Sequence, residues 1–396
     1  MAYTQQQKDH IKRLAEQHLE ICSSEKNKKN GGLWNDPKTG WNRDMWRGDP
    51  KPAKNGKIPY TIAFDNSLMA AVLGLDLRDY YSDPYVHLEA QLRNSAYHFA
   101  EWHDNHFFTP ELFIWFGVVT ELTFFGAQLA YYPDKEPWIK STLISSGEDV
   151  DRLGMLDFFK SGSMPKLIEY YEKMRELAGD QLTVMFPTWA RGPFCIAAHL
   201  MGLQNMLCTM LTEPEFAHKL LRYITDNIKQ WSLERNKYTG QPLVPGKLYN
   251  DEIDVPMMSP AMYKEFVLPY EIELSGFFGG IRYWHSCGKT TDVMEHIVKI
   301  PNLTMFHVSP WADEKKAAEI LSPRDISLDV CLDPERDLYF NDDAKVRERL
   351  IQLRENCKGT RWSPRFDALQ PRGVLQNNLE LIKRIDRIAC EVYGDI

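Results

Sequence analysis

His285 and Cys287 are the pair of residues in this sequence best suited to chemistry. They follow an apolar run over residues 281–284 and precede Gly288, a pattern that predicts a strand ending in a turn. Side chains two positions apart on a strand lie on the same side of it, so the imidazole and the thiol can approach one point. A borderline-soft ion such as zinc binds these two ligand types. The alternative is a buried pair that binds no metal, because free cysteine is among the most buried residue types.

Alternating strands and helices must position this pair. From about residue 180 onward, the sequence predicts strands over residues 181–189, 247–253, 281–286, 303–308, 326–332 and 360–364. It predicts helices over residues 195–212, 213–238, 259–275, 290–299, 313–321, 342–356 and 375–392. Strict alternation implies parallel strands joined by right-handed crossovers. The number of units favours an α/β fold of the closed (β/α)8 type, a TIM barrel.

Polar and metal-capable residues recur where the predicted strands end, while the strand bodies are expected to be apolar. They are Asn250, Asp251, Glu252, His285, Cys287, His307, Ser309, Cys331, Asp333, Arg365 and Asp367. In such a barrel all strand ends share one face, and that face carries the active site. A histidine, a thiolate and a third ligand hold zinc and leave a fourth position for substrate. Without metal, the same carboxylates and imidazoles can transfer protons. Singly, each residue could also be a turn, a cap or a core side chain.

The first 60 residues differ from the rest. A helix is predicted near residues 5–22, followed by a stretch over residues 23–57 that is rich in Lys, Asn, Gly and Pro. This stretch contains Trp34, Trp41 and Trp46. We therefore expect two parts: residues 1–60 form a helical lead-in and a long loop that folds over the barrel mouth, and residues 61–396 form the barrel.

Composition excludes some classes of protein. A formal net charge of −8 without a basic patch argues against nucleic-acid binding. The longest apolar stretch, residues 112–132, contains Glu121, Gln128 and two glycines, so we expect a buried helix and strand there and no membrane span. Seven scattered cysteines without a secretory signal predict reduced thiols and a cytoplasmic protein.

Several segments, in order along residues 60–395, resemble the uroporphyrinogen decarboxylase superfamily, and most of all its corrinoid-dependent methyltransferase branch. They are Phe125-Gly126-Ala127, Tyr132-Pro133-Asp134, Pro137-Trp138, the run 148–153, Gly192-Pro193-Phe194, Gly202-Leu203, Thr212-Glu213-Pro214, Asn250-Asp251-Glu252, the run 259–270, the run 285–291, Leu332-Asp333-Pro334 and Asn377-Asn378-Leu379. The resemblance implies the same barrel fold. It also implies zinc bound through His285 and Cys287, and methyl transfer to or from cobalamin carried by a separate corrinoid protein.

The third zinc ligand is the point at which this chain departs from the family pattern. Thiol-methylating members use a cysteine in a late Gly-Cys-Gly turn, whereas residues 363–367 here contain no cysteine. Cys331 is the first replacement we consider and Glu252 the second, followed by Asp251 and Asp367. The chain also lacks the Asp-x-His-x-x-Gly motif that ligates cobalamin, so the cobalt is expected on the partner protein.

The resemblance and the strand-end residues together predict a zinc-dependent substrate:corrinoid methyltransferase that O-demethylates a small methoxylated aromatic compound. The expected site residues are Asp251, Glu252 and His307 for catalysis, Trp46, Trp284, Trp311 and Arg365 for substrate binding, and His285, Cys287 and Cys331 for metal. A homo-oligomer is compatible with the sequence.

Two other functions remain open. One is a metal-independent decarboxylase or lyase acting on a small carboxylic acid, with protons handled by Asp251, His285 and His307 and the carboxylate held by Arg365. Decarboxylation of a porphyrin is disfavoured, because only Arg43 and Arg47 stand where the decarboxylase proper has an arginine-rich motif. The other is a barrel that only binds and delivers a corrinoid or another small ligand.

Overall fold

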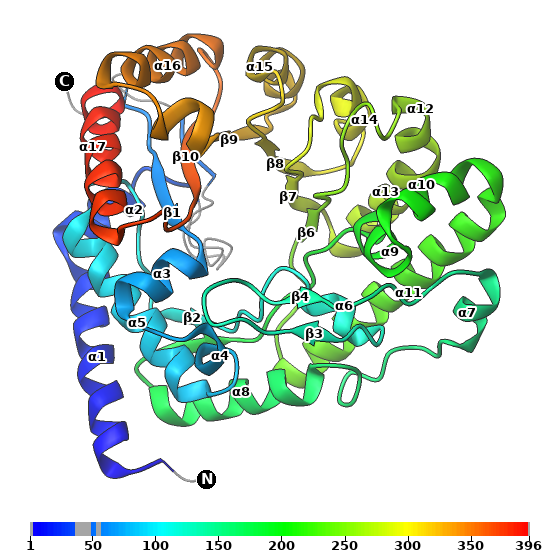
Figure 1. The fold of residues 1–396 in the computed structure, drawn as a ribbon, viewed down its shortest axis with the longest axis horizontal. Coiled ribbons are helices and arrows are strands. Elements are labelled where there is room, and N and C mark those ends of the chain that lie inside the picture. Colours follow the sequence, from blue (N-terminus) through cyan, green and yellow to red (C-terminus); the bar gives the residue numbers. More distant parts are fainter. Residues whose placement is uncertain (1–2, 36–48, 53–56, 395–396) are drawn as a thin grey trace.

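A curved parallel sheet forms the centre of the computed structural model, which describes residues 3–35, 49–52 and 57–394. The strand order is β1-β10-β9-β8-β7-β6, and every neighbouring pair is parallel. The bounds are β1 (Thr61–Phe64), β6 (Gly246–Tyr249), β7 (Ile281–His285), β8 (Leu303–Val308), β9 (Ser327–Leu332) and β10 (Trp362–Leu369). The sheet curves, with the connecting helices on its outer side (Figure 1).

The helices that join these strands confirm the predicted β-then-α alternation. They are α13 (Leu268–Phe278), α14 (Met294–Ile297), α15 (Glu314–Leu321) and α16 (Asp343–Asn356), followed by α17 (Leu375–Tyr393) after the last strand. Ser259 caps the segment before α13 as its sequence position suggests, because its side chain accepts a hydrogen bond from the backbone N–H of Met262. That segment comprises α12 (Pro260–Met262) and a π-helical turn (Tyr263–Val267).

Two further strands form a separate parallel pair, β2 (Glu111–Phe113) and β5 (Thr183–Met185). A single parallel bridge between Arg191 and Tyr249 connects the chain after β5 to β6. Within the described residues, no ladder joins this pair to the six-stranded sheet. The parallel curled sheet is therefore established, and the closed eight-stranded barrel is not. A short antiparallel pair, β3 (Leu129–Ala130) and β4 (Trp138–Ile139), lies apart from both.

Helices account for most of the remaining chain. Before β5 they are α3 (Asn66–Leu73), α4 (Leu77–Tyr80), α5 (Pro84–Glu101), α6 (Thr120–Phe124), α7 (Gly147–Arg152) and α8 (Met164–Ala178). Between β5 and β6 they are α9 (Pro193–Met201), α10 (Leu203–Thr212) and α11 (Pro214–Thr239). The helix predicted over residues 195–212 is thus two helices, bent by 106° at Gly202, whose φ of 87° an L side chain rarely adopts.

The N-terminal segment is more helical than its composition suggests. The predicted helix is α1 (Gln5–Ser23), begun by a capping box between Thr4 and Gln7. A second helix, α2 (Glu25–Gly31), lies where a loop was expected. Trp34 is buried, and its indole N–H donates to the backbone carbonyl of Asn105 at 2.9 Å, so it anchors this segment by packing. Trp41 and Trp46 lie outside the described residues.

Among the described helices, none is by itself long and apolar enough to cross a membrane. The bent pair α9 and α10 meets the length and composition criteria only when its two halves are counted together.

The two faces of the curled sheet carry different side chains. Trp284 and Phe306 lie on the face toward the helices, where their rings stack at 5.2 Å and the Trp284 indole N–H contacts Glu271 of α13. The register pairs Tyr249 with His285, Tyr283 with Met305, His307 with Asp329 and Cys331 with Arg365 on the opposite, inner face. The sequence predicted apolar strand bodies. The inner face differs from this expectation, because it carries ionisable groups along its length.

Candidate functional site

Asp251, His285 and Cys287 form one group of potential metal ligands, with one ligand atom from each within 4.8 Å of the others. His285 is the last residue of β7, and Cys287 follows in the loop. Asp251 lies in the turn after β6, the neighbouring strand. The Nε2 atom of His285 lies 3.0 Å from Asp251 Oδ1 and 3.3 Å from Cys287 Sγ. The sequence predicted the histidine and the cysteine as a pair, and the fold adds a carboxylate from an adjacent strand end.

A close approach between two loops brings Asp251 to this point. The Ser286 hydroxyl donates to the Ile253 carbonyl at 2.8 Å, and the Val255 N–H donates to the Lys289 carbonyl at 3.0 Å. A Cβ atom added at Gly288 would lie 2.4 Å from the Ile253 oxygen, which is closer than van der Waals contact allows. Glycine at this position is therefore required for the loop after β7 to pack against the turn after β6.

A buried hydrogen-bond chain orients the His285 ring. Arg365 donates to Asp329 at 3.1 Å, and the Tyr283 hydroxyl donates to the same carboxylate at 2.5 Å. The Tyr283 oxygen can then accept from Nδ1 of His285, 3.3 Å away. This arrangement favours the tautomer with its proton on Nδ1, which leaves the Nε2 lone pair directed at Asp251 and Cys287. Outer partners of this kind fix the ring of a metal-ligating histidine.

His307 supports the same ring from the neighbouring strand. Its imidazole stacks on that of His285 with 4.0 Å between the ring centroids. Its Nδ1 lies 2.8 Å from the Ser286 carbonyl oxygen, so this nitrogen carries the proton and donates it. His307 therefore lies beside the group of ligands, in contact with His285.

Charges around the group favour an ionised carboxylate. Arg191 is buried, and its Nη1 atom lies 3.2 Å from Asp251 Oδ2. Burial alone would raise the pKa of Asp251. A proton on His285 Nε2, which would donate to Oδ1 in place of a bound cation, and the charge of Arg191 outweigh burial and hold the pKa below its ordinary value. Cys287 is an exposed residue, but its thiol lies against His285, where loss of water contact and then the Asp251 charge raise its pKa. A bound cation would reverse this effect and favour the thiolate.

The donor set fits zinc. Imidazole nitrogen, thiolate sulfur and carboxylate oxygen are the three ligand types that zinc takes in proteins, and a three-ligand site leaves one position open. Asp251 Oδ1 is buried and faces His285 Nε2 at 3.0 Å. With the His285 proton on Nδ1, both facing atoms carry lone pairs, and a cation between them would satisfy both. His285, Cys287 and Asp251 are thus the residues that would hold the ion.

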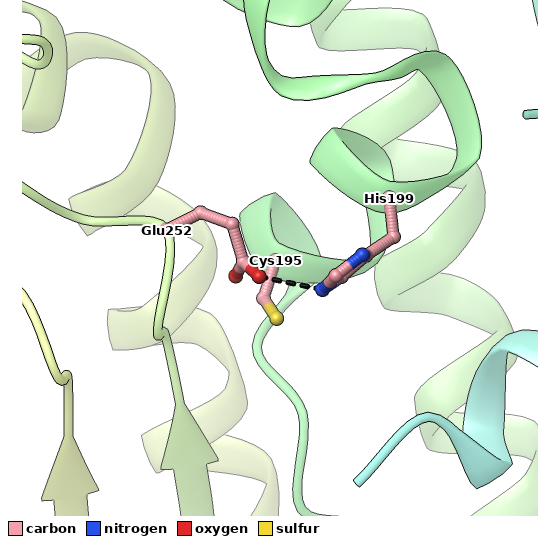
Figure 2. A group of neighbouring side chains, drawn as sticks. All are labelled: Cys195, His199 and Glu252. Atoms are coloured by element: carbon pink, nitrogen blue, oxygen red, sulfur yellow. Dashed lines mark ion pairs between the residues drawn. The ribbon is translucent and has the colours of Figure 1, made fainter. Parts of the chain in front are cut away.

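A second group of potential ligands lies beside the first and comprises Cys195, His199 and Glu252 (Figure 2). Cys195 and His199 are one helical turn apart on α9, so their side chains share one face. Glu252 comes from the turn after β6, and its Oε1 lies 2.5 Å from His199 Nε2. Glu252 is among the residues predicted from the sequence, whereas Cys195 and His199 are not. The available signal was the Cys-x-x-x-His spacing that begins two residues after Pro193.

The remaining predicted site residues lie in different surroundings. Cys331 is buried on β9 outside both groups, although close enough for its charge to affect Cys287. Arg365 is buried and ion-paired with both Asp329 and Asp367. Trp284 is fully buried on the helix-facing side of the sheet, because successive side chains on a strand alternate. Trp311 is 56% exposed, beside Arg336 on the surface. Trp46 lies outside the described residues.

A mostly apolar cavity shares the Tyr249 side chain with the surroundings of the first group of ligands, although none of the three ligands lines it. Its walls come from the segments around β2, β5 and β6, and they include Phe113, Trp115, Phe116, Phe124 and Tyr249. The Tyr249 ring meets the His285 ring edge-on, with 5.2 Å between centroids. Aromatic side chains with an ionisable group at one end are typical of a binding site for a flat organic molecule.

Comparison with known proteins identifies the family. Residues 72–362 match the family model described as "Uroporphyrinogen decarboxylase (URO-D)". The chain belongs to this family. The resemblance seen in the sequence motifs is thereby confirmed at the level of the family.

Two comparisons find similarity between this URO-D family member and methyltransferases from Methanosarcina mazei. A methylated-thiol–coenzyme M methyltransferase is 23% identical over 182 residues, which is 46% of this chain and about half (48%) of the length of that relative. A solved structure of a methyltransferase is 14% identical, with a TM-score of 0.62 over 85% of this chain and 95% of that chain. The second similarity shows a shared fold.

Proposed function

We propose that this URO-D family protein is a zinc-dependent methyltransferase that removes a methyl group from a small methoxylated aromatic compound and passes it to cobalamin on a partner corrinoid protein. The observation that carries the proposal is the convergence of Asp251, His285 and Cys287 on one point beside an aromatic cavity. The similarity to a methyltransferase that acts on methylated thiols supports methyl transfer as the reaction class.

The proposed chemistry assigns a role to each residue of the site. Bound zinc would act as a Lewis acid on the ether oxygen and make the phenolate a better leaving group. His285 and Cys287 would hold the ion with Asp251, while Tyr283 keeps the His285 ring in the required tautomer. His307 would restrain the same ring by stacking. Asp251, which the sequence ranked after Cys331 and Glu252 as a candidate third ligand, takes that position in this proposal.

The substrate ring is proposed to lie in the aromatic cavity. Phe113, Trp115 and Phe116 would pack against its faces, and Tyr249 would contact it next to the ligand group. We further propose that β2 and β5 complete a barrel of eight strands, because the Arg191–Tyr249 bridge already connects their side to β6. Such closure would make this cavity the interior of the barrel mouth, where enzymes of this architecture bind substrates.

The experiment combines the purified protein, a reduced corrinoid protein and a panel of methoxylated phenols and aromatic acids. Absorption spectroscopy would follow formation of the methylated corrinoid. We expect at least one compound to methylate it, and we expect chelation of zinc or the Cys287→Ala change to abolish the signal. Cys208→Ser, a change at an exposed cysteine on α10, serves as the matched control and should retain activity.

The competing function is decarboxylation of a small carboxylic acid without metal. In that scheme Arg365 would hold the substrate carboxylate, but this arginine is already paired with Asp329 and Asp367. The structure therefore favours methyl transfer. This alternative predicts that the metal-free protein releases carbon dioxide from a carboxylic acid and that no donor in the panel methylates the corrinoid. Those two results together would replace our proposal with decarboxylation.

A further inference from the structure

We propose that Cys195, His199 and Glu252 form a second binding site for a borderline-soft divalent cation such as zinc, separate from the site formed by Asp251, His285 and Cys287. This site is independent of the proposed methyl transfer. It would connect helix α9 to the turn after β6, two segments that are about fifty residues apart in the sequence.

The geometry of the three side chains supports coordination. One ligand atom from each lies within 4.8 Å of the other two, and Figure 2 shows the thiol, the imidazole and the carboxylate directed toward a common region. The spacing of four residues puts Cys195 and His199 on the same face of α9. Thiolate, imidazole and carboxylate from three positions are the donor set of a zinc site with one open position.

Two of the ligand atoms lack the hydrogen bonds that buried polar atoms normally make. His199 Nε2 and Glu252 Oε2 are buried and have no hydrogen-bond partner in the described structure. The Nε2 atom does lie 2.5 Å from Glu252 Oε1, but as an ion pair and not as a hydrogen bond of good geometry. Buried polar atoms without such partners destabilise the folded state. A bound cation would satisfy both of them.

The local charges are balanced when both sites are filled. An ionised Cys195 and Glu252 together neutralise one divalent ion, and an ionised Asp251 and Cys287 neutralise another. Arg191 lies between the two groups, with its Nη1 atom 2.6 Å from Cys195 Sγ and 3.2 Å from Asp251 Oδ2. Its guanidinium thus contacts one anionic ligand of each site and would separate the two ions.

A glycine allows α9 to approach the turn that carries Glu252. A Cβ atom at Gly192 would lie 2.0 Å from the side-chain oxygen of Asn250, so no larger residue fits without displacing one of the two segments. The Gly192 N–H also donates to the Tyr249 carbonyl at 3.0 Å. The site is therefore built on segments that the backbone holds together without a metal.

Cobalt substitution tests the proposal without depending on enzyme activity. Cobalt(II) replaces zinc, and a thiolate ligand gives it a charge-transfer absorption band. We expect the protein to bind about two cobalt ions per chain and the Cys287→Ala variant about one, with the band still present because Cys195 supplies a thiolate. The double variant Cys287→Ala, Cys195→Ser should lose the band. The matched double variant Cys287→Ala, Cys208→Ser should retain it.

Loss of the band in Cys287→Ala alone, or its persistence after Cys195 is also replaced, would overturn the second site. His199→Gln in the Cys287→Ala background provides a separate measurement that leaves every remaining cysteine in place. It should weaken cobalt binding by about 10-fold or more, and unchanged affinity would contradict the proposal. Methyl-transfer activity does not enter these measurements, so failure of the proposed function and failure of this site give different results.

Discussion

At the scale of single residues, the sequence and the geometry favour different residues as the third metal ligand. Cys331 was our first choice from the sequence, whereas Asp251 is the residue within 4.8 Å of the other two ligand atoms. We predict that Asp251→Asn lowers zinc affinity at this site by about 10-fold or more. Cys331→Ser should change it little. Isothermal titration with zinc in the Cys195→Ser background would measure both, and the opposite ranking would restore Cys331 as the ligand.

Tyr283 is the positioning residue that the sequence did not indicate. Its hydroxyl lies between Asp329 and Nδ1 of His285. We predict that Tyr283→Phe weakens zinc binding roughly 10-fold, because the His285 ring loses the partner that fixes its tautomer. The fold should persist, since the phenyl ring keeps the same packing.

A matched variant distinguishes this effect from the general loss of a tyrosine hydroxyl. Tyr223, half-buried on α11, donates to the Gly154 carbonyl at 2.9 Å and makes no hydrogen bond to any of the ligands within the described residues. Tyr223→Phe should leave zinc affinity unchanged. Equal loss of affinity in both variants would argue that Tyr283 acts only through stability.

At the scale of elements, the close approach of two loops decides where Asp251 lies. We predict that Gly288→Ala lowers the free energy of unfolding by roughly 1–3 kcal/mol, because the added methyl group overlaps the Ile253 carbonyl. It should also weaken zinc binding, since the turn that carries Asp251 must move. Denaturant unfolding and zinc titration would measure the two effects.

Gly276 offers the matched control. It lies within α13, and a Cβ atom there would meet nothing within 4 Å. Gly276→Ala should be neutral or stabilising by up to about 1 kcal/mol, since alanine favours the helix. Destabilisation by both variants to the same extent would contradict the steric explanation.

At the scale of the whole molecule, buried acids and buried histidines oppose each other in the pH dependence of stability. Burial raises the pKa of Glu271 to about 7, although Asn250, Trp284 and Tyr263 contact its carboxylate. The folded state then holds a proton that the unfolded state releases, so this group makes stability fall as pH rises from about 4.5 to about 7. Burial lowers the pKa of His87 to about 4, which makes stability rise with pH up to about 6.5.

We therefore predict a pH-dependent difference between the protein and its Glu271→Gln variant. As pH rises from about 4.5 to 7, the variant should gain stability relative to the parent. The gain should be on the order of 3 kcal/mol, because a pKa difference of one unit between the folded and unfolded states corresponds to about 1.4 kcal/mol. Thermal unfolding across this range would measure it. Glu265→Gln, at an exposed position nearby, is the control and should show no such trend. A constant difference at every pH would show that Glu271 is ionised in the folded state.

The sequence by itself determined the order and type of the elements in the C-terminal half. The strand predicted over residues 303–308 coincides with β8 (Leu303–Val308), and the last helix ends within one residue of its predicted end. These elements follow from local signals, namely apolar runs between turns and helix caps, which act over a few residues. The same kind of signal identified His285 and Cys287, because both lie at the end of one strand.

Only the tertiary structure decided which distant residues join that pair. Asp251 reaches His285 because Gly288 permits two loops to touch, and Glu252, its neighbour in sequence, instead meets Cys195 and His199 on α9. Trp284 had appeared suited to a binding site but packs against the helices, since its position in the alternation of β7 directs it there. Such outcomes depend on strand register and on contacts between segments far apart in the chain, and a local pattern contains neither of them.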